Sequence, residues 1–272
     1  MLVVNFSIFK SISNFFRERK LMNQISDAES REALNSAIAE AMSHPLSAEQ
    51  IETAKSKGRN SALEKMSNSS TIEEYQKFFR LATVFQSSEK EIQEAKQEAI
   101  DKALKKIEKT EYAEYYTSAK KFVTELGVDE KQLHSAEEMC RKNVLSKIIN
   151  VGDDSTLKEL LKLSKDILVD ENLLNDAKKQ CKENAYKRLE KANFVSDVEK
   201  IASIADLCGA SYQETLKAKH STHCIIIYRI QQSTSLSEAQ RLALVAGALG
   251  LEPLLIDTAV KMVQERIAKQ NT

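Results

Sequence analysis

Two histidines and two cysteines gather in one short stretch of the sequence and carry the side chains that bind zinc. They are Cys208, His220, His223 and Cys224. Four such ligands hold zinc tetrahedrally in structural sites, and a spacing of four residues places His220 and Cys224 on one face of a helix. The sequence, however, contains a repeat of 41 residues, and the positions equivalent to Cys208 in the other repeats carry Phe, Leu or Ile. Core cysteines with surface histidines are the alternative, and we assign no metal.

A second chemical pattern is a set of basic residues that recur every 41 residues. Its members are Lys65, Lys106, Lys147, Arg188 and Arg229. In a stack of repeats their side chains form a positive stripe, which suits an acidic protein segment or a phosphate backbone. The alternative is that their long stems cover the edge of the core while the charged ends pair with carboxylates of the chain itself. Because 40 Lys and Arg residues balance 40 Asp and Glu residues, we do not expect nucleic-acid binding.

Acidic pairs are the remaining residues with catalytic chemistry. They occur at Glu73–Glu74, Glu137–Glu138 and Asp153–Asp154. Acids at helix starts are stabilised by the helix dipole without any catalytic role. The sequence has no Gly-rich phosphate loop, no G-x-S-x-G and no H-E-x-x-H. We therefore expect a protein that is not an enzyme and needs no cofactor.

The elements that position these residues follow a repeat of 41 residues. Steps of 41 from Ser47 reach four more residues suited to cap a helix N-terminus, which are Ser88, Asp129, Asp170 and Ser211. Four of the five repeats carry Gln or Glu three residues later, which closes a capping box. The alanine column then reads Ala54, Ala95, Ala136, Ala177 and Ala218. A small residue at this place lets a neighbouring helix approach closely.

The second half of each repeat predicts another amphipathic helix. In the first repeat its apolar positions are Tyr75, Phe78, Leu81 and Phe85, spaced as one helix face. The residue after this face is glycine in three of the five repeats, at Gly127, Gly209 and Gly250. Glycine is typical of a left-handed helix end. The links between repeats should therefore be short and constant in length.

These patterns predict an all-α fold, an α-solenoid-like stack of about five two-helix repeats, with a closed multi-helix bundle as the alternative. The repeats are 46–86, 87–127, 128–168, 169–209 and 210–250. Half-repeats flank them at 27–44 and 251–270, so residues 27–272 should form one domain. The low content of turn formers, 6 Gly and 2 Pro, argues against an all-β fold. The repeat length is in the range of HEAT and armadillo repeats, but their residue signatures are missing, so we assign no family.

Residues 1–26 read as an apolar helix apart from the repeats. Phe6, Phe9, Phe15 and Phe16 are its candidate contacts with a membrane surface or a partner, with basic residues near them for lipid head groups. The alternative is a cap over the end of the stack. The segment is not a typical secretory signal, because its charges follow its apolar part. Met22 is an alternative start, which leaves open whether residues 1–21 belong to the native chain.

The preferred function is a cytoplasmic scaffold that binds protein segments, because helical stacks present extended surfaces. One alternative is a peripheral membrane protein anchored by residues 2–20; the others are a zinc-binding or a nucleic-acid-binding helical protein. Residues 224–230 read CIIIYRI and are apolar on nearly all sides, which indicates burial or a homo-oligomer contact through the C-terminal repeat. The four cysteines lack a C-x-x-C spacing and suit a reducing compartment.

Overall fold

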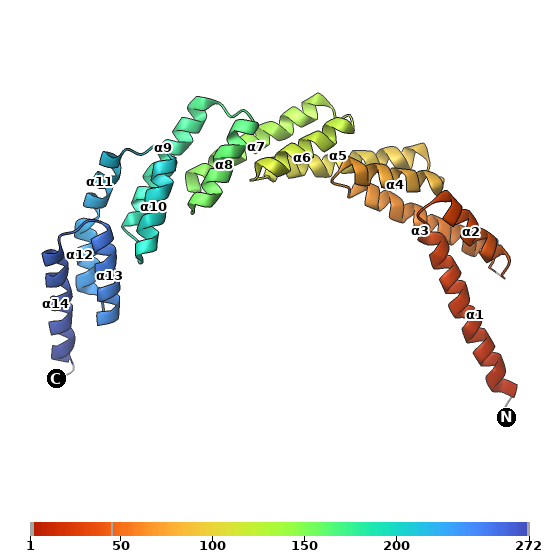
Figure 1. Cartoon of the computed structure of the whole chain (residues 1–272), viewed down its shortest axis with the longest axis horizontal. Helices are drawn as coiled ribbons and strands as arrows, with labels where there is room; N and C mark the ends of the chain where they lie inside the picture. Colours follow the sequence, from red (N-terminus) through yellow and green to blue (C-terminus); the bar gives the residue numbers. More distant parts are fainter. Residues whose placement is uncertain (1–2, 45, 271–272) are drawn as a thin grey trace. The chain divides into compact units, whose positions relative to one another are not determined.

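The described residues form helices that pack on their neighbours, and the predicted all-α class is confirmed (Figure 1). The computed structural model describes residues 3–44 and 46–270, with side chains from Phe15 onward. These described residues form fourteen helices and no strand. The helices are α1 Val3–Ser26, α2 Arg31–Met42, α3 Ala48–Ser67, α4 Ile72–Val84, α5 Glu89–Lys109, α6 Ala113–Glu125, α7 Glu130–Asn150, α8 Asp154–Asp166, α9 Glu171–Leu189, α10 Val195–Leu207, α11 Tyr212–Ser221, α12 His223–Gln232, α13 Leu236–Ala248 and α14 Pro253–Gln270.

The helix starts follow the spacing expected from the sequence. The helices α3, α5, α7, α9, α11 and α14 begin at residues 48, 89, 130, 171, 212 and 253, in steps of 41. The helices α2, α4, α6, α8, α10 and α13 begin at residues 31, 72, 113, 154, 195 and 236, again in steps of 41. We call the two groups first helices and second helices, and a first helix with the second helix that follows it a hairpin.

Side-chain caps explain why several helices begin where they do. Ser47 and Gln50 form a complete capping box at the start of α3, as do Ser211 and Glu214 at α11. At α5, Glu91 accepts a hydrogen bond from the Ser88 amide, and its own amide donates to the Ser88 hydroxyl. Such caps satisfy amide groups that have no partner within the helix.

The buried face of each hairpin consists of the apolar columns seen in the sequence. The first buried column of the second helices contains Tyr75, Tyr116, Leu157, Val198 and Ala239. The last column of the first helices contains Met66, Ile107, Ile148, Leu189 and Ile230. In the alanine column, Ala54, Ala95, Ala136 and Ala177 are buried, but Ala218 is only partly so. Burial of apolar area is the main force that holds such hairpins together.

The exception at Ala218 reflects a break in one first helix. The sequence predicts a single helix from Ser211 onward, but the structure ends α11 at Ser221 and begins α12 at His223. Between them Thr222 is buried, and its hydroxyl donates to the carbonyl of Lys219 at 2.7 Å. A side chain that bonds to nearby backbone in this way competes with the helix. The expectation that His220 and Cys224 share one helix face is therefore wrong.

The chain folds as two units. Unit 1 is Met1–Ile107 with Thr117–Ala136, and unit 2 is Glu108–Tyr116 with Glu137–Thr272. In unit 1, α1 packs against α2 and α3. In unit 2, α12, α13 and α14 lie side by side (Figure 1). Within the described part of the chain, the combination of length and hydropathy that a bilayer-crossing helix needs does not occur.

Candidate functional site

Three members of the basic column contact the chain itself, Lys147 and Arg229 at junctions between successive hairpins and Lys65 within its own hairpin. Lys147 bonds to the Glu111 carboxylate at 2.6 Å, and the Lys65 amine lies 5.9 Å from the centre of the Phe78 ring. The Arg229 guanidinium donates to the carbonyls of Glu190 and Ala192 and to the Asn193 side chain. Lys106 is exposed and Arg188 is half-buried. These contacts favour the alternative in which the charged ends meet groups of the chain itself over a free positive stripe.

A second polar column makes the same kind of junction. Asn143 donates to the Glu108 carbonyl at 2.8 Å, and Asn184, at the same position of the next repeat, donates to the Ile149 carbonyl at 3.2 Å. Arg266, at the same position of α14, donates to the Gln231 carbonyl at 2.7 Å. Each carbonyl lies in the last turn of the preceding first helix, where backbone acceptors have no partner within the helix. The junctions between hairpins are therefore specific polar contacts as well as apolar packing.

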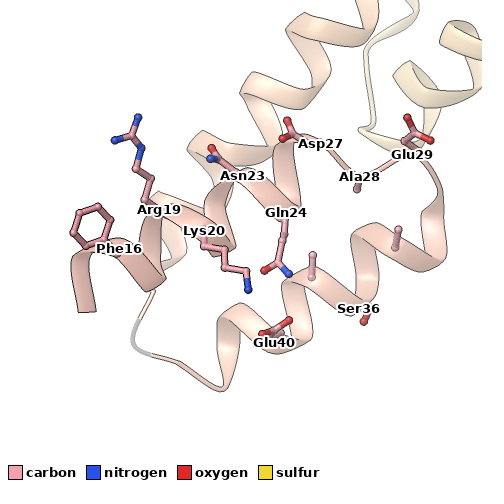
Figure 2. A pocket seen from close by; sticks show the side chains of 12 residues that line it. Phe16, Arg19, Lys20, Asn23, Gln24, Asp27, Ala28, Glu29, Ser36 and Glu40 are labelled. Carbon is pink, nitrogen blue, oxygen red and sulfur yellow. The ribbon is translucent and has the colours of Figure 1, made fainter. Parts of the chain in front are cut away.

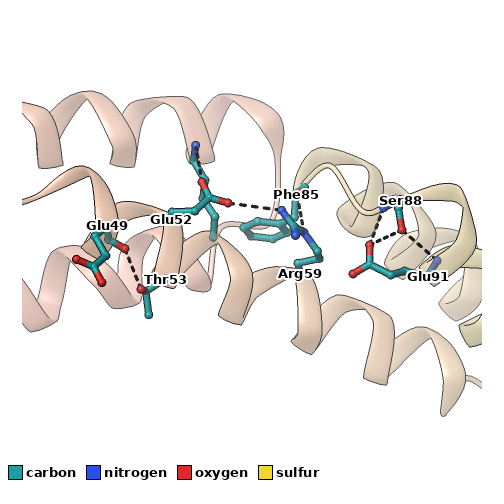
Figure 3. Close-up of polar contacts among 8 residues, drawn as sticks. Glu49, Glu52, Thr53, Arg59, Phe85, Ser88 and Glu91 are labelled. Carbon is teal, nitrogen blue, oxygen red and sulfur yellow. Dashed lines mark hydrogen bonds and ion pairs between the residues drawn. The ribbon is translucent and has the colours of Figure 1, made fainter.

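A third column ties the two helices of one hairpin together. The Arg59 Nε donates to the Phe85 carbonyl at 3.1 Å, as Figure 3 shows, and the Arg141 Nε donates to the Ile167 carbonyl at 2.6 Å. In the hairpin of α11–α13, His223 Nε2 lies 3.1 Å from the Leu249 carbonyl. In each case a side chain of the first helix reaches the residue that ends the second helix.

The zinc candidates do not come together as a metal site. Among the residues with described side chains, no three His, Cys, Asp or Glu groups lie close enough to hold an ion. The rings of His220 and His223 have centroids 4.9 Å apart, and Cys224 is exposed. Cys208 is buried at the end of α10. The four residues therefore give no geometry for zinc.

Of the four N-terminal phenylalanines singled out in the sequence, the structure describes the side chains of two. Phe15 and Phe16 are 60% and 62% exposed, whereas the side chains of Phe6 and Phe9 lie outside the described residues. Further along α1, Leu21 and Ile25 are buried against α2 and α3. The helix is thus packed over its C-terminal part and carries exposed aromatic side chains before it.

A groove between α1 and α2 begins at Phe16. It has a volume of about 750 Å³ and is lined by both apolar and charged residues. Figure 2 shows Lys20 and Gln24 extending from α1 toward α2, where Glu40 lies. The groove is polar on both walls, so it offers less apolar contact area than the groove at the other end of the chain.

That second groove runs between α13 and α14 and has a volume of about 750 Å³. Leu244, which is 68% exposed, and Val260 supply its apolar surface, and Arg241, Asp257 and Lys261 supply charge. Leu254, Leu255 and Met262 of α14 are also exposed. The apolar stretch at 224–230 is by contrast partly covered, because α12 packs on α13 and α14 and buries Ile226 and Ile230.

Two residues of the second groove occupy positions that hold a second helix in other hairpins. Val260 lies one repeat after Lys219, whose amine donates to the Ala248 carbonyl of α13. Gln264 lies one repeat after His223, in the column that reaches Phe85, Ile167 and Leu249. Elsewhere these positions face a second helix, and in the described residues no helix follows α14. The α13–α14 groove is therefore shaped like the seat of a second helix.

No known protein family matches the chain, and comparisons with curated proteins and with solved structures give no significant match. The site must therefore be judged on its own geometry. The sequence pointed to the C-terminal repeat as a contact surface, through residues 224–230, but did not identify the α13–α14 groove. Its signal was available, because Leu244 and Val260 are apolar where the preceding repeat carries Ser203 and Lys219.

Proposed function

We propose that this protein is a non-enzymatic interaction scaffold that binds an amphipathic helix of a protein partner in the α13–α14 groove. The observation that carries the proposal is the match between this groove and the seat of a second helix. The second helices α4, α6, α8, α10 and α13 are each 13 residues long with one buried face. A partner helix of similar length and pattern fits the same seat.

The second helix α10 is an example of the contacts that we expect for the partner helix. It lies against both α8 and α9, and its Ser203 hydroxyl donates to the Asp154 carboxylate of α8 at 3.2 Å. A partner helix on α13 and α14 would cover Leu244 and Val260 and would place its last carbonyls near Gln264. Helix-in-groove binding of this kind takes its affinity from a few apolar anchors.

The test compares proteins captured from native cells by the full chain and by groove variants. Leu244→Glu and Val260→Glu place charge in the groove and should abolish capture of the partner. Leu173→Glu is the matched control, because Leu173 is an exposed leucine on α9. A synthetic peptide of residues 153–168, which contains α8, should compete with the partner. The proposal would be contradicted if all variants captured the same proteins, or if the peptide did not displace the captured proteins.

A second candidate function is attachment to an anionic lipid surface through α1. The exposed pair Phe15 and Phe16 favours it, because α1 continues N-terminally beyond the part that packs on α2 and α3 (Figure 1). Residues 1–20 contain four basic residues and one acidic residue. Aromatic side chains with nearby cations are typical of helices that lie in the membrane interface.

Vesicle sedimentation tests this candidate with the full chain. The protein should pellet with vesicles that contain phosphatidylserine and should stay in solution with phosphatidylcholine alone. The double substitution Phe15→Ser and Phe16→Ser should reduce pelleting several-fold, whereas Tyr212→Ser, at another exposed aromatic residue, should not. Pelleting that does not depend on lipid charge or on the two phenylalanines would rule out this attachment.

A further inference from the structure

One member of the basic column, Arg188, carries a buried group that has no partner. The residue lies in the last turn of α9 and is half-buried. Its Nε atom is shielded from solvent and forms no hydrogen bond. A buried donor without an acceptor is costly, because it has lost its bonds to water and gained none in return. Lys106 of the same column is exposed, so water can serve its amine. Arg188 is therefore a cation that lacks an oxygen acceptor.

Two other members of the column show which position supplies such an acceptor. The Lys147 amine bonds to the Glu111 carboxylate at 2.6 Å. The Arg229 Nη2 donates to the side-chain oxygen of Asn193, also at 2.6 Å. In both junctions the acceptor is the side chain of the residue 36 positions before the cation.

The junction of α9 with the segment before α8 follows the same register but lacks that side chain. Asn184, one turn before Arg188, donates to the Ile149 carbonyl at 3.2 Å, as the equivalent asparagine of the preceding repeat does at its own junction. The residue 36 positions before Arg188 is Gly152. A Cβ atom added at Gly152 would meet no atom within 4 Å. The place of the acceptor is therefore open space.

The two acids that follow this glycine are engaged elsewhere. Asp153 caps the start of α8, and Asp154 bonds to the Lys158 amine at 3.1 Å. Within the described part of the chain, neither carboxylate forms an ion pair with Arg188. Their charges oppose a doubly charged anion such as phosphate more strongly than a singly charged one, because Coulomb repulsion grows with the charge of the ligand. The surroundings therefore favour a carboxylate.

We propose that Arg188 and the open space at Gly152 form a binding site for a carboxylate side chain of an acidic protein segment. A carboxylate accepts two parallel N–H bonds from a guanidinium, and Nε can donate one of them. In the preceding repeat the same place holds the glutamate side chain of Glu111, so an aspartate or glutamate of a partner fits it. This site does not use the α13–α14 groove, so the two proposals stand or fail separately.

The test is an NMR titration of the full chain that follows the Nε–H signals of Arg188 and Arg229. The probes are sodium acetate and a blocked peptide of three glutamates, each added in exchange for sodium chloride at constant ionic strength. The Arg188 signal should shift along a saturating curve with both probes, and the peptide should saturate it at a lower concentration. Arg229 is the internal control and should not shift, because its guanidinium is already bonded. Arg188→Lys removes the Arg188 signal and thereby assigns it.

Two substitutions at Gly152 separate the site from general effects of charge. Gly152→Glu supplies the carboxylate within the chain, so it should abolish the acetate shift and should melt at a higher temperature than Gly152→Ala. Gly152→Ala is the matched control, because it adds only a Cβ atom in open space and should keep the shift. Circular dichroism checks that both variants fold.

The titration of the unchanged protein decides the proposal even if a variant does not fold. The proposal is overturned if neither probe gives a saturating shift, or if Arg229 shifts as much as Arg188. A shift with acetate but none with the peptide would also overturn it, because the site would then exclude a protein segment. A saturating shift with inorganic phosphate alone would overturn the preference for a carboxylate.

Discussion

At the scale of single residues, the hairpins are held by residues of complementary size. The clearest case is Gly58, against which the Phe85 ring packs so closely that a Cβ atom would lie 2.5 Å away. The column of Gly58 continues with small residues and the column of Phe85 with mostly larger ones, and the members of both are buried. The pairs in register are Gly58 with Phe85, Ala99 with Leu126, Cys140 with Ile167, Cys181 with Cys208 and Thr222 with Leu249.

This complementarity predicts a strong coupling between Gly58 and Phe85. Gly58→Ala alone should destabilise the protein by about 1 kcal/mol, because overpacking costs about 1–3 kcal/mol and alanine regains up to about 1 kcal/mol of helix propensity. Phe85→Leu should relieve the contact with the ring, since an alanine and a leucine occupy these columns at Ala99 and Leu126, while the contact of the added Cβ with the Ser26 carbonyl at 2.9 Å remains. Denaturant unfolding of the two single variants and the double variant gives the coupling energy. A double variant no more stable than the sum of the single effects would contradict the contact.

The cap at Glu214 predicts a specific pH dependence. The Lys182 amine bonds to its carboxylate at 2.7 Å, and this bond, helped by Ser211, lowers the pKa of Glu214 from 4.5 to about 2. Because the folded pKa lies below the unfolded value, the stabilisation is fully present above about pH 4.5 and is lost as the pH falls toward 2. Carboxyl chemical shifts should show Glu214 titrating near 2, and Lys182→Met should raise that pKa. Titration of Glu214 near 4.5 in the unchanged protein would show that the bond is absent.

At the scale of elements, five links have the same backbone conformation. The residue that follows the end of α4, α6, α8, α10 and α13 has positive φ, at Gln86, Gly127, Leu168, Gly209 and Gly250. The sequence predicts this conformation at the three glycines. Gln86 and Leu168 adopt it although their side chains disfavour it, because the next first helix must begin at the same place.

Leu168 is the clearest position at which to test this conformation. Leu168 has φ of 53° and an exposed side chain, so Leu168→Gly removes left-handed strain without removing core packing. The strain costs about 1–2 kcal/mol and the added freedom of unfolded glycine costs about 0.5–1 kcal/mol, so stability should rise by about 0.5–1 kcal/mol. Gly127→Ala is the opposite control and should lower stability. Thermal unfolding measures both, and a less stable Leu168→Gly protein would count against the assigned link.

Helix starts and buried columns could be predicted from the sequence because caps and apolar spacing are local signals. The break at Thr222 could not, since it depends on a buried hydroxyl that bonds to its own backbone. The sequence left open whether residues 1–26 cap the stack or contact a membrane or partner. In the structure α1 packs on α2 and α3, and its buried Leu21 and Ile25 stand one repeat before Ala62 and Met66. The α13–α14 groove could not be predicted, because a single sequence does not show which faces of α13 and α14 other helices cover.

At the scale of the whole molecule, the account is that one two-helix unit recurs in register along the chain. Junction contacts at Asn143, Asn184 and Arg266 recur at the same position of their repeats, as do the helix starts. In such a protein, stability is a sum of unit and junction terms. The proposed partner helix uses the same junction geometry, so the function rests on the register as much as the fold does.

Removal of one whole unit is the most direct test of that register. Deletion of residues 128–168 joins Gly127 to Val169 in place of Val128, which restores the same dipeptide before the next helix cap. The shortened protein should stay folded, with unchanged helical circular dichroism per residue and one cooperative melting transition. Deletion of residues 128–161 breaks the register, so that protein should have less helical circular dichroism per residue and no cooperative melting transition. Equal loss of structure in the two deletions would contradict the account.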